Sequence, residues 1–374
     1  LSLVAFGLVM VYSATSATEA IGNGDPLYFL KRQTIYAVIG AGLMALAAHT
    51  SFHRLRVLSP ALVLTSFALC IAVLVIGREV NGARRWLTFG PAVFQPSELA
   101  KVAVAIWAAA YLARKGPPRS LGELARPLGL VAGCFCALIL LEPDLGTTIA
   151  IVVMLGATLL VIGTRPRTLV AAGVIAAALA VAAVWFEPYR RARFFAFVDP
   201  WHDAEGAGFQ IVQAMIGIGS GGISGRGLGE GLAKIHYLPE AHTDMIFAVI
   251  GEELGLIGAT GIIGAYALFA YAGLKIALRC RDPFGKTLAA ALTALVCGQA
   301  AINLAAVLGL APLTGIPLPF VSYGGSSLVM GLTSVGILLN IAGNHGRRAG
   351  AQVPDRRRRN GRTRDAGARS RRRA

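Results

Sequence analysis

Residues 237–255 read YLPEAHTDMIFAVIGEELG and place an acidic residue, Asp244, at the edge of an apolar run. The pattern predicts a helix that starts near Pro239 and becomes apolar from Met245 onward. An ionisable side chain at such a boundary is a functional candidate by default. Partial burial would raise its pKa and make it a better general base, whereas a nearby Arg or Lys would act in the opposite direction. Asp244 is therefore the candidate base, and an ion pair with Lys234 or an external arginine is the alternative.

The other charged residues of this stretch have different positions along the predicted helix. Glu240 and His242 precede Asp244 and are candidates for a supporting role at the same site. Glu252 would lie about 12 Å further along the helix axis and about 80° around it, and Glu253 would face the other side. At least one of these two glutamates is therefore expected to pair with another helix or with water.

Two further polar stretches adjoin apolar runs. The segment LLEPDLGT predicts a tight hairpin with Glu142 as a polar cap and Asp144 as the cap of the next helix. Residues 311–328, APLTGIPLPFVSYGGSSL, contain prolines that prevent a regular helix, and Ser326 and Ser327 then open the final helix. The free N–H groups and hydroxyls of that helix start would suit an anion. A kinked re-entrant loop is a compatible alternative.

A glycine-rich stretch, GIGSGGISGRGLGEG, occupies residues 217–231. It lacks the GxxxxGK[ST] pattern of a phosphate-binding loop and has no buried strand before it. We therefore expect a flexible external loop, which would be able to order around a ligand.

These polar sites interrupt a chain of 374 residues that is 55% hydrophobic and only 14% charged, against about 25% charged in soluble proteins. Because only helices satisfy their backbone within lipid at this segment length, we expect an all-α polytopic membrane protein. A large external loop, 187–244, separates the seventh and eighth spans. The ten spans, of which the first lacks Met and is expected to be a clipped helix, are 1–13, 33–49, 57–76, 98–113, 127–141, 146–163, 168–186, 245–278, 287–309 and 324–343.

Basic loops give the orientation. Short loops rich in Lys and Arg mark the cytoplasmic side, and here they are 49–56, 114–126, 164–167 and 279–286. Because the number of spans is even, both termini lie on one side of the membrane. With the basic loops inside, that side is the cytoplasm. The tail, 344–374, holds twelve arginines and two aspartates and is predicted to be disordered. Contact with anionic lipid explains it better than binding to nucleic acid, and we expect no nucleic-acid partner.

Two arginine clusters oppose this orientation because they fall in external segments. Arg84 and Arg85 belong to NGARRW, and Arg191 belongs to YRRARF together with Arg190 and Arg193. Guanidinium groups match phosphate geometry, so an anionic substrate such as a pyrophosphate would explain an external positive cluster. Anchoring to phospholipid headgroups explains it equally well.

Several of these segments together resemble the SEDS family (shape, elongation, division and sporulation) of bacterial cell-wall polymerases. They are NGARRWLTFGPAVFQPSELAK, EPDLGT, GSGGISGRGLGEG, YLPEAHTDMIFAVIGEELG and TGIPLPFVSYGGSS, in the family's order across residues 1–343. NGARRW and EAHTD look like the cell-division branch. Met245 stands where the family usually has Phe after the aspartate, which changes apolar bulk and leaves the acid in place.

The resemblance implies a peptidoglycan glycosyltransferase that uses lipid II, a disaccharide-pentapeptide on undecaprenyl pyrophosphate. Asp244 matches the family's essential carboxylate and would take the proton from the 4-hydroxyl of the acceptor sugar. Other residues would stabilise the pyrophosphate charge or contact the substrate. This expected binding set is Arg84, Arg85, Lys101, Arg191, Lys234, His242, Glu240, Ser326 and Ser327.

The resemblance also implies partners and a location. The partners would be a class B penicillin-binding transpeptidase and other membrane proteins of the division complex. The protein would lie in the bacterial plasma membrane at the division septum, with its C-terminus in the cytoplasm. A divalent cation, Mg²⁺ or Mn²⁺, could assist, although no ligand cluster in the sequence demands one.

Two rival functions remain open at this stage. A lipid II flippase would suit ten helices with buried charge, but it needs polar groups through the whole bilayer depth. Here the charges gather at the external side, apart from Glu252 and Glu253. The other rival is a non-catalytic membrane scaffold of the division machinery, with the basic tail as its contact.

Overall fold

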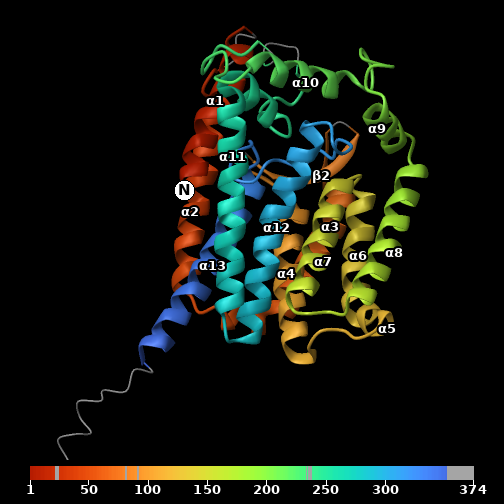
Figure 1. The fold of residues 1–374 in the computed structure, drawn as a ribbon, viewed down its shortest axis with the longest axis vertical. Coiled ribbons are helices and arrows are strands. Elements are labelled where there is room, and N and C mark those ends of the chain that lie inside the picture. The colour runs from red at the N-terminus through yellow and green to blue at the C-terminus, as the bar shows by residue number, and fades with distance from the viewer. Residues whose placement is uncertain (22–24, 81, 91, 233, 235–237, 352–374) are drawn as a thin grey trace, which may run out of the picture.

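The computed structural model describes residues 1–21, 25–80, 82–90, 92–232, 234 and 238–351. The chain forms a bundle of long helices, with shorter helices and turns across one end (Figure 1). The predicted all-α polytopic class is therefore confirmed for the bundle, and one small sheet is added to it.

Each of the ten predicted apolar segments coincides with a helix. The helix between 121 and 141 is composite, with a short α5 (Leu121–Leu124) and a π-helical turn (Ala125–Gly129) before α6. Six helices of the described residues are long and apolar enough to cross a membrane, and α1 and α7 contain shorter apolar stretches. The ten are α1 (Ser2–Ile21), α2 (Tyr28–His49), α3 (His53–Ile76), α4 (Pro96–Lys115), α6 (Leu130–Leu141), α7 (Leu145–Val161), α8 (Pro166–Trp185), α11 (Ile246–Arg279), α12 (Pro283–Val307) and α13 (Gly325–Ala351).

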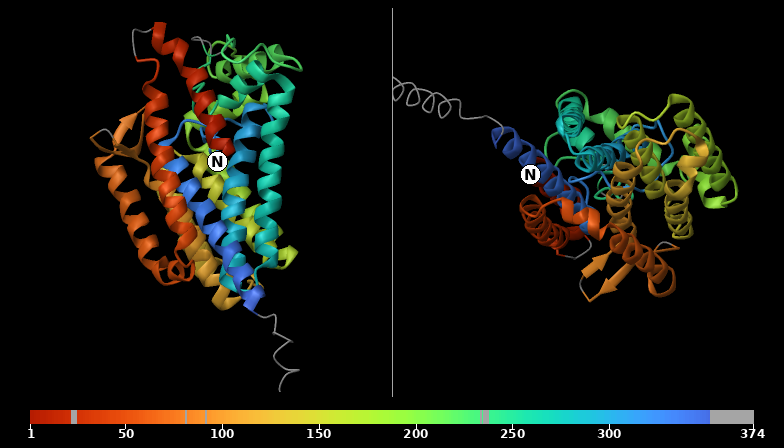
Figure 2. Two further views of the ribbon diagram at one scale, coloured as in Figure 1. Left: turned by 90° about the vertical axis from the view of Figure 1, so that its left-hand side faces the viewer. Right: turned by 90° about the horizontal axis from the view of Figure 1, so that it is seen from below.

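Helices α4 and α12 form the centre of the bundle. Helix α12 packs against α4, α7 and α11, and most of the residues along α4 are buried. Helix α13 lies along α2 (Figure 2). Helix α8 stands at the edge, where Thr168 is its one buried residue and its apolar side chains face outward, as expected for a lipid-facing helix.

Residues 78–94 depart from the predicted all-α class. They form a three-stranded antiparallel sheet, β1 (Arg78–Val80), β2 (Ala83–Phe89) and β3 (Ala92–Phe94), in the order β1-β2-β3. The segment carries Val, Trp, Thr and Phe, which favour strands, and glycines with positive φ stand at Gly82 and Gly90 between the strands. The sheet leads directly into α4 and so fixes its start.

The external segment 187–244 is partly helical, with α9 (Pro188–Val198) and α10 (Phe209–Gly221). The expected helix start at Pro239 is wrong, because residues 238–245 form turns and α11 begins at Ile246. Glu240 has φ of +55°, a left-handed conformation that a continuous helix does not accommodate. Asp244 is therefore held in a turn above α11 rather than on its first helical turn.

The glycine-rich stretch is ordered against α11, contrary to the expected flexible loop. Helix α11 is broken at Gly255, whose φ is +63°. Residues 222–227 lie in the break and replace the missing helical hydrogen bonds. The bonds are Arg226 N to Glu252 O and Gly227 N to Glu253 O at 3.0 Å each, Leu256 N to Gly222 O at 3.0 Å and Ile257 N to Ile223 O at 3.2 Å.

Close backbone approach explains why glycines occupy this contact. A Cβ on Gly225 would lie 2.1 Å from the carbonyl oxygen of Glu253, and one on Gly221 would lie 2.0 Å from that of Gly251. Any side chain would push the two segments apart. Backbone inside a membrane protein needs partners within the protein, so this contact stabilises a helix that could not otherwise break there.

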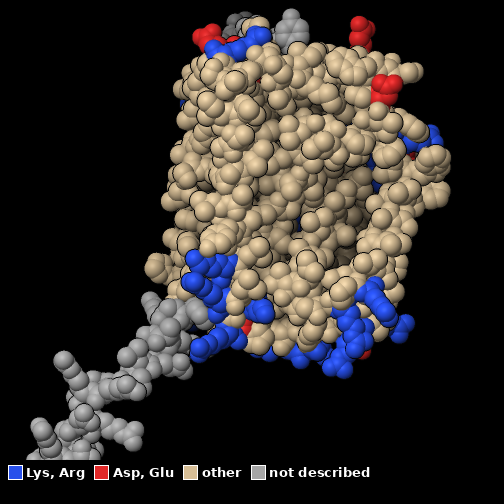
Figure 3. Space-filling view, in the orientation of Figure 1, with Lys and Arg blue, Asp and Glu red and all other residues tan. Residues whose placement is uncertain are grey.

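Helix α13 continues to Ala351, past the predicted tail boundary at 344, and residues 352–374 of the expected tail lie outside the described residues. Lys and Arg side chains gather at the end of the bundle where α13 emerges (Figure 3). The α2–α3 turn is at the same end, where Phe52 N donates to Asn340 Oδ1 at 3.2 Å. Basic side chains and the start of the tail therefore share one end of the bundle, and which side of the membrane this end faces stays a prediction.

The break in α11 yields a stability prediction. Replacing Gly255 with Ala puts a Cβ 2.4 Å from the backbone nitrogen of Gly225 and forces a left-handed non-glycine residue, which alone costs about 1–3 kcal/mol. We expect a lower midpoint of thermal unfolding in detergent.

Gly264→Ala in the same helix is the matched control, because its added Cβ meets nothing within 4 Å. Alanine favours a helix over glycine by about 0.5–1 kcal/mol, so this variant should unfold at an equal or higher temperature. Equal midpoints for the two variants would contradict the role of Gly255.

Candidate functional site

Asp244 lies in the turn between α10 and α11 and is 8% exposed. Its backbone carbonyl accepts a hydrogen bond of 2.8 Å from Asn303 Nδ2 of α12. Thr243 Oγ1 lies 3.3 Å from Asp244 Oδ1 and 2.9 Å from Glu240 Oε2, and its single proton serves one of them at a time. The loop 308–324 passes close to the carboxylate, since a Cβ on Gly315 would lie 3.9 Å from Asp244 Oδ2. The carboxylate is thus enclosed by two segments far apart in the sequence.

The surroundings raise the pKa of Asp244 to about 6 from its ordinary 3.8. Burial is the largest cause, because desolvation disfavours the charged form, and the negative charge of Glu240 adds to it. Arg193 and the hydrogen bond from Thr243 lower the pKa and limit the rise. A carboxylate with this pKa is mostly ionised at neutral pH and is a stronger base than an exposed aspartate.

The two residues expected to support Asp244 take different positions. Glu240 is exposed and accepts a hydrogen bond of 2.9 Å from Thr243 Oγ1, so its effect on Asp244 is electrostatic. The His242 ring packs against Phe29 and Tyr323, with centroids 4.5 Å and 5.5 Å away. Its carbonyl accepts from Tyr323 N at 2.8 Å. His242 therefore joins the turn to α2 and to the 308–324 loop.

The arginine whose charge acts on the pKa of Asp244 is Arg193, not Arg191. Arg193 stacks on the Tyr189 ring at 4.8 Å and donates to Leu313 O at 3.4 Å, whereas Arg191 is exposed. The two residues lie on opposite sides of α9, because two positions along a helix correspond to about 200°. Helical periodicity within PYRRARFFAFV was the signal that separates them.

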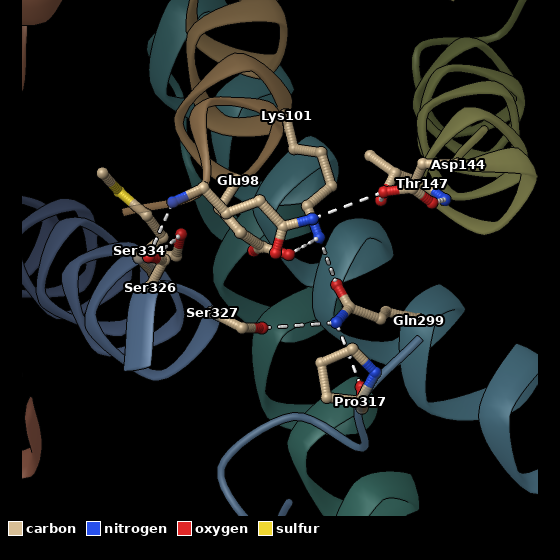
Figure 4. A network of polar contacts seen from close by, with 11 residues as sticks. Glu98, Lys101, Asp144, Thr147, Gln299, Pro317, Ser326, Ser327 and Ser334 are labelled. Atoms are coloured by element: carbon tan, nitrogen blue, oxygen red, sulfur yellow. Dashed lines mark hydrogen bonds and ion pairs between the residues drawn. The ribbon is translucent and has the colours of Figure 1, made fainter. Parts of the chain in front are cut away.

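A second polar group lies deep among α4, α12 and α13 (Figure 4). Lys101 is 1% exposed, and its Nζ donates to Glu98 Oε1 and Gln299 Oε1 at 2.8 Å each. Gln299 Nε2 donates to Pro317 O at 3.1 Å and Ser327 Oγ at 3.4 Å. Lys101 and Ser327, both candidates from the sequence, thus meet in one network beside the same loop that covers Asp244.

Ser326 joins the start of α4 to α13. Its Oγ accepts from Gln95 N at 3.0 Å, and Gln95 Nε2 donates to Asp144 Oδ2 at 3.4 Å. Asp144 accepts from Thr147 N at 2.9 Å, which confirms the predicted cap of α7. The first turn of α13 is therefore anchored to both α4 and α7.

Arg84 and Arg85 of the NGARRW motif make different contacts. Arg84 pairs with Glu79 at 3.3 Å on the sheet and is half exposed. Arg85 donates to the carbonyl oxygens of Glu142, at 2.9 Å, and Pro143. Arg85 therefore holds the hairpin between α6 and α7, while Arg84 stays accessible.

Glu142 points into the protein instead of capping the hairpin. Its side chain is fully buried, and burial raises its pKa to about 8, with the charge of Asp144 acting in the same direction. A carboxyl with this pKa is mostly protonated at neutral pH, which removes the cost of burying a charge.

Lys234 is not brought to Asp244. Its Nζ donates to Glu253 Oε1 at 2.7 Å, Gly229 O at 2.7 Å and Ser13 Oγ at 3.1 Å, and both charged side chains of the pair are buried. Three acceptors match the three N–H donors of an ammonium. Glu252 accepts from Leu232 N at 2.9 Å. The expectation that at least one of the two glutamates pairs with another helix is confirmed, because Ser13 Oγ of α1 donates to Glu253 Oε2 at 2.7 Å. The geometry favours a structural role for Lys234.

The described part of the chain was searched for side chains that could bind a metal ion. No three His, Cys, Asp or Glu side chains there are grouped so that they could hold an ion. A cation held mainly by the oxygens of a substrate pyrophosphate needs fewer protein ligands, so assistance by Mg²⁺ or Mn²⁺ stays a prediction.

Several residues of the site were not predicted from the sequence. Asn303, Gln299, Gln95 and Glu98 carry much of its hydrogen bonding, yet amides and a paired carboxylate have no catalytic signature of their own. One signal was available: Gln299 and Asn303 are four residues apart in an apolar helix and so share a face.

The fold and this buried polar site define a multi-pass helical membrane protein with a carboxylate at one end of its bundle. Residues 1–346 match the FtsW/RodA/SpoVE family, described as "Cell cycle protein", and the chain belongs to that family. The SEDS resemblance is thereby confirmed.

Named relatives give the same result. The chain is 41% identical over 343 residues to the probable peptidoglycan glycosyltransferase FtsW of Geobacter sp. strain M18, covering 91% of this chain and 94% of that protein. It is 38% identical to stage V sporulation protein E of Bacillus subtilis strain 168, with 91% and 94% covered.

Two solved structures share the fold. One chain, from a structure titled "Structural coordination of polymerization and crosslinking by a peptidoglycan synthase complex", has a TM-score of 0.75 and 34% identity, covering 92% of this chain and 96% of that one. The rod shape determining protein RodA of Thermus thermophilus has a TM-score of 0.66 and 30% identity, with 92% and 94% covered.

The role of Lys234 can be tested through stability. Lys234→Ala leaves Glu253 buried without its countercharge, which typically costs about 3–5 kcal/mol. The thermal midpoint in detergent should fall strongly, and a double variant, Lys234→Met with Glu253→Gln, should recover much of the loss. The control is Lys31→Ala, because its pair with Asp25 is exposed and contributes little to stability. A Lys234→Ala midpoint as high as that of the control would refute the structural role.

Proposed function

We propose that this protein is a peptidoglycan glycosyltransferase that polymerises lipid II into glycan strands during septal cell-wall synthesis. The observation that carries the proposal is the enclosed carboxylate of Asp244, whose pKa is raised to about 6 and which is held in a turn at the end of the bundle. Family membership and relatives named as glycosyltransferases support it.

The proposed reaction is a single displacement at the donor's anomeric carbon. Asp244 accepts the proton of the acceptor's 4-hydroxyl while that oxygen forms a bond to the anomeric carbon. The bond from this carbon to the pyrophosphate oxygen breaks, and undecaprenyl pyrophosphate leaves with the electron pair. One attack inverts the centre, and the pyrophosphate needs no proton to leave, so one carboxylate is sufficient.

Cationic and hydroxyl groups from several elements would bind the pyrophosphate. Arg193 lies near the base, Arg84 is accessible, and the α13 start with Ser326 and Ser327 offers hydroxyls. Lys101 would contribute through its buried network, where Glu98 offsets its charge. Arg191 is accessible on α9. Donors aimed at a developing anion are worth most in a site that excludes water.

Partners and location follow from the same proposal. The likeness to a chain of a peptidoglycan synthase complex supports a class B penicillin-binding transpeptidase as a partner, with other division-complex membrane proteins. The basic end of the bundle supports a cytoplasmic C-terminus next to anionic lipid, and the FtsW relatives support a septal location.

The positions of the buried charged residues support a flippase less well than a glycosyltransferase. Glu98 and Lys101 sit in the first two turns of α4, and Glu252 and Glu253 lie before the break in α11. These buried charges are concentrated toward one end of the bundle and do not form a polar path through its depth.

The decisive experiment compares the wild type with Asp244→Asn. Each protein is purified with its cognate transpeptidase and supplied with lipid II, and glycan polymer is measured. Loss of a general base should lower the rate about 10²–10⁴-fold. Equal polymer from both would reject Asp244 as the base. Absence of polymer from either protein, with lipid translocation intact, would establish the flippase instead.

The raised pKa of Asp244 predicts an acidic limit to the reaction. A base works when ionised, so kcat/KM should fall as the pH drops through about 6. Glu240→Gln removes a charge that raises this pKa and should move the limit to lower pH. Arg193→Gln removes a charge that lowers it and should move the limit to higher pH. Shifts in one common direction would contradict the assignment.

A further inference from the structure

We infer that Asn303 of α12 is a positioning residue for the polymerisation reaction, because its amide fixes the Asp244 turn to the 308–324 loop. This inference rests on the proposed function. Asn303 is 2% exposed, and its Nδ2 donates to Asp244 O and to Ile316 O at 2.8 Å each. One side chain thus joins two segments that meet at the carboxylate.

The chemistry of the contact requires an amide. Two carbonyl oxygens converge on one nitrogen, and a carboxamide NH₂ supplies two N–H donors. The amide is therefore oriented with Nδ2 toward the two carbonyl oxygens. In the flipped orientation Oδ1, which is itself an acceptor, would face two other acceptors and form no hydrogen bond. A hydroxyl would serve one carbonyl, and a carboxylate neither.

Gln299 makes the equivalent contact one turn earlier on α12. Its Nε2 donates to Pro317 O at 3.1 Å, and its Oε1 accepts from Lys101 at 2.8 Å. Consecutive carbonyls of the loop, at residues 316 and 317, are therefore held by two amides on one helix face. Asn303 also binds the backbone of Asp244, and Gln299 also binds Lys101 of the Glu98–Lys101 pair. Helix α12 therefore sets the distance between the proposed base and the buried ammonium group.

The other backbone contacts of the turn lie on either side of Asp244: His242 O accepts from Tyr323 N at 2.8 Å, and Met245 N donates to Glu240 O at 3.4 Å. Asp244 precedes the first helical residue of α11, Ile246, and so lacks the ladder of bonds that would fix a residue within the helix. The position of the carboxylate consequently depends on the Asn303 contact. A displacement of about 1 Å in a reacting group can lower the rate about 10²-fold.

Removing the donors should slow catalysis without weakening substrate binding. In Asn303→Asp both N–H donors are lost, two buried carbonyls lose their partner, and a negative charge is added near Asp244. We expect kcat about 10–100-fold lower, KM for lipid II unchanged and the acidic limit moved to higher pH. Asn303→Ser keeps one donor and should retain an intermediate kcat.

A distant amide of the same kind provides the matched control. Asn340 of α13 is also buried, donates to Ala48 O at 2.6 Å and accepts from Phe52 N at 3.2 Å near the opposite end of the bundle. Asn340→Asp and Asn340→Ser should lower the thermal midpoint as the Asn303 variants do. They should leave kcat and the pH profile as in the wild type.

The measurements are initial rates against lipid II concentration, their pH profile and the thermal midpoint, for the full chain with its cognate transpeptidase. Asn303 variants with wild-type kcat and pH profile, or with a change in KM alone, would overturn the inference. The thermal midpoint of each variant shows whether it is folded at the assay temperature. If Asn303→Asp does not fold, the kcat of the milder Asn303→Ser variant tests the inference. Failure of the proposed function would appear separately, as unimpaired polymerisation by Asp244→Asn.

Discussion

Hydrocarbon offers no hydrogen bonds, and this constraint accounts for most of the irregular features of the bundle. At two places where the backbone departs from a helix, another part of the chain supplies its partners. Residues 222–227 do so at the break in α11, and Gln299 and Asn303 do so for the loop after α12. The same requirement applies to charge, and Lys101 and Lys234 each have a carboxylate and further acceptors.

Asp244 differs from the other buried charges in this respect. Lys234 and Glu253 form a direct pair, as do Lys101 and Glu98. The Asp244 carboxylate has a weak bond from Thr243 and the more distant charge of Arg193, so desolvation dominates and its pKa rises. The buried Glu142 has a pKa of about 8 and is mostly neutral at neutral pH, so among the under-compensated carboxyls it is Asp244 that is ionised and able to act as a base.

The sequence predicted the ten helices because long apolar runs have one structural solution in lipid. It identified Asp244 because an acid at the edge of such a run is costly, and the family resemblance strengthened that choice. It did not predict the sheet at 78–94, whose strands are too short for their alternation to stand out, nor the turn that replaces a helix start at Pro239. The choice between Arg191 and Arg193 depended on a helix in a segment read as a loop. Long-range contacts such as Lys234 with Glu253 depend on tertiary packing that local patterns do not encode.

The glycine contact at Gly255 also has a topological consequence. Residues 227 and 253 are joined through their backbones, so the chain between them, which includes the Asp244 turn, forms a closed ring fastened to a single helix. A residue added or deleted within this ring has to be accommodated between two fixed ends, whereas one added before α10 falls outside the ring.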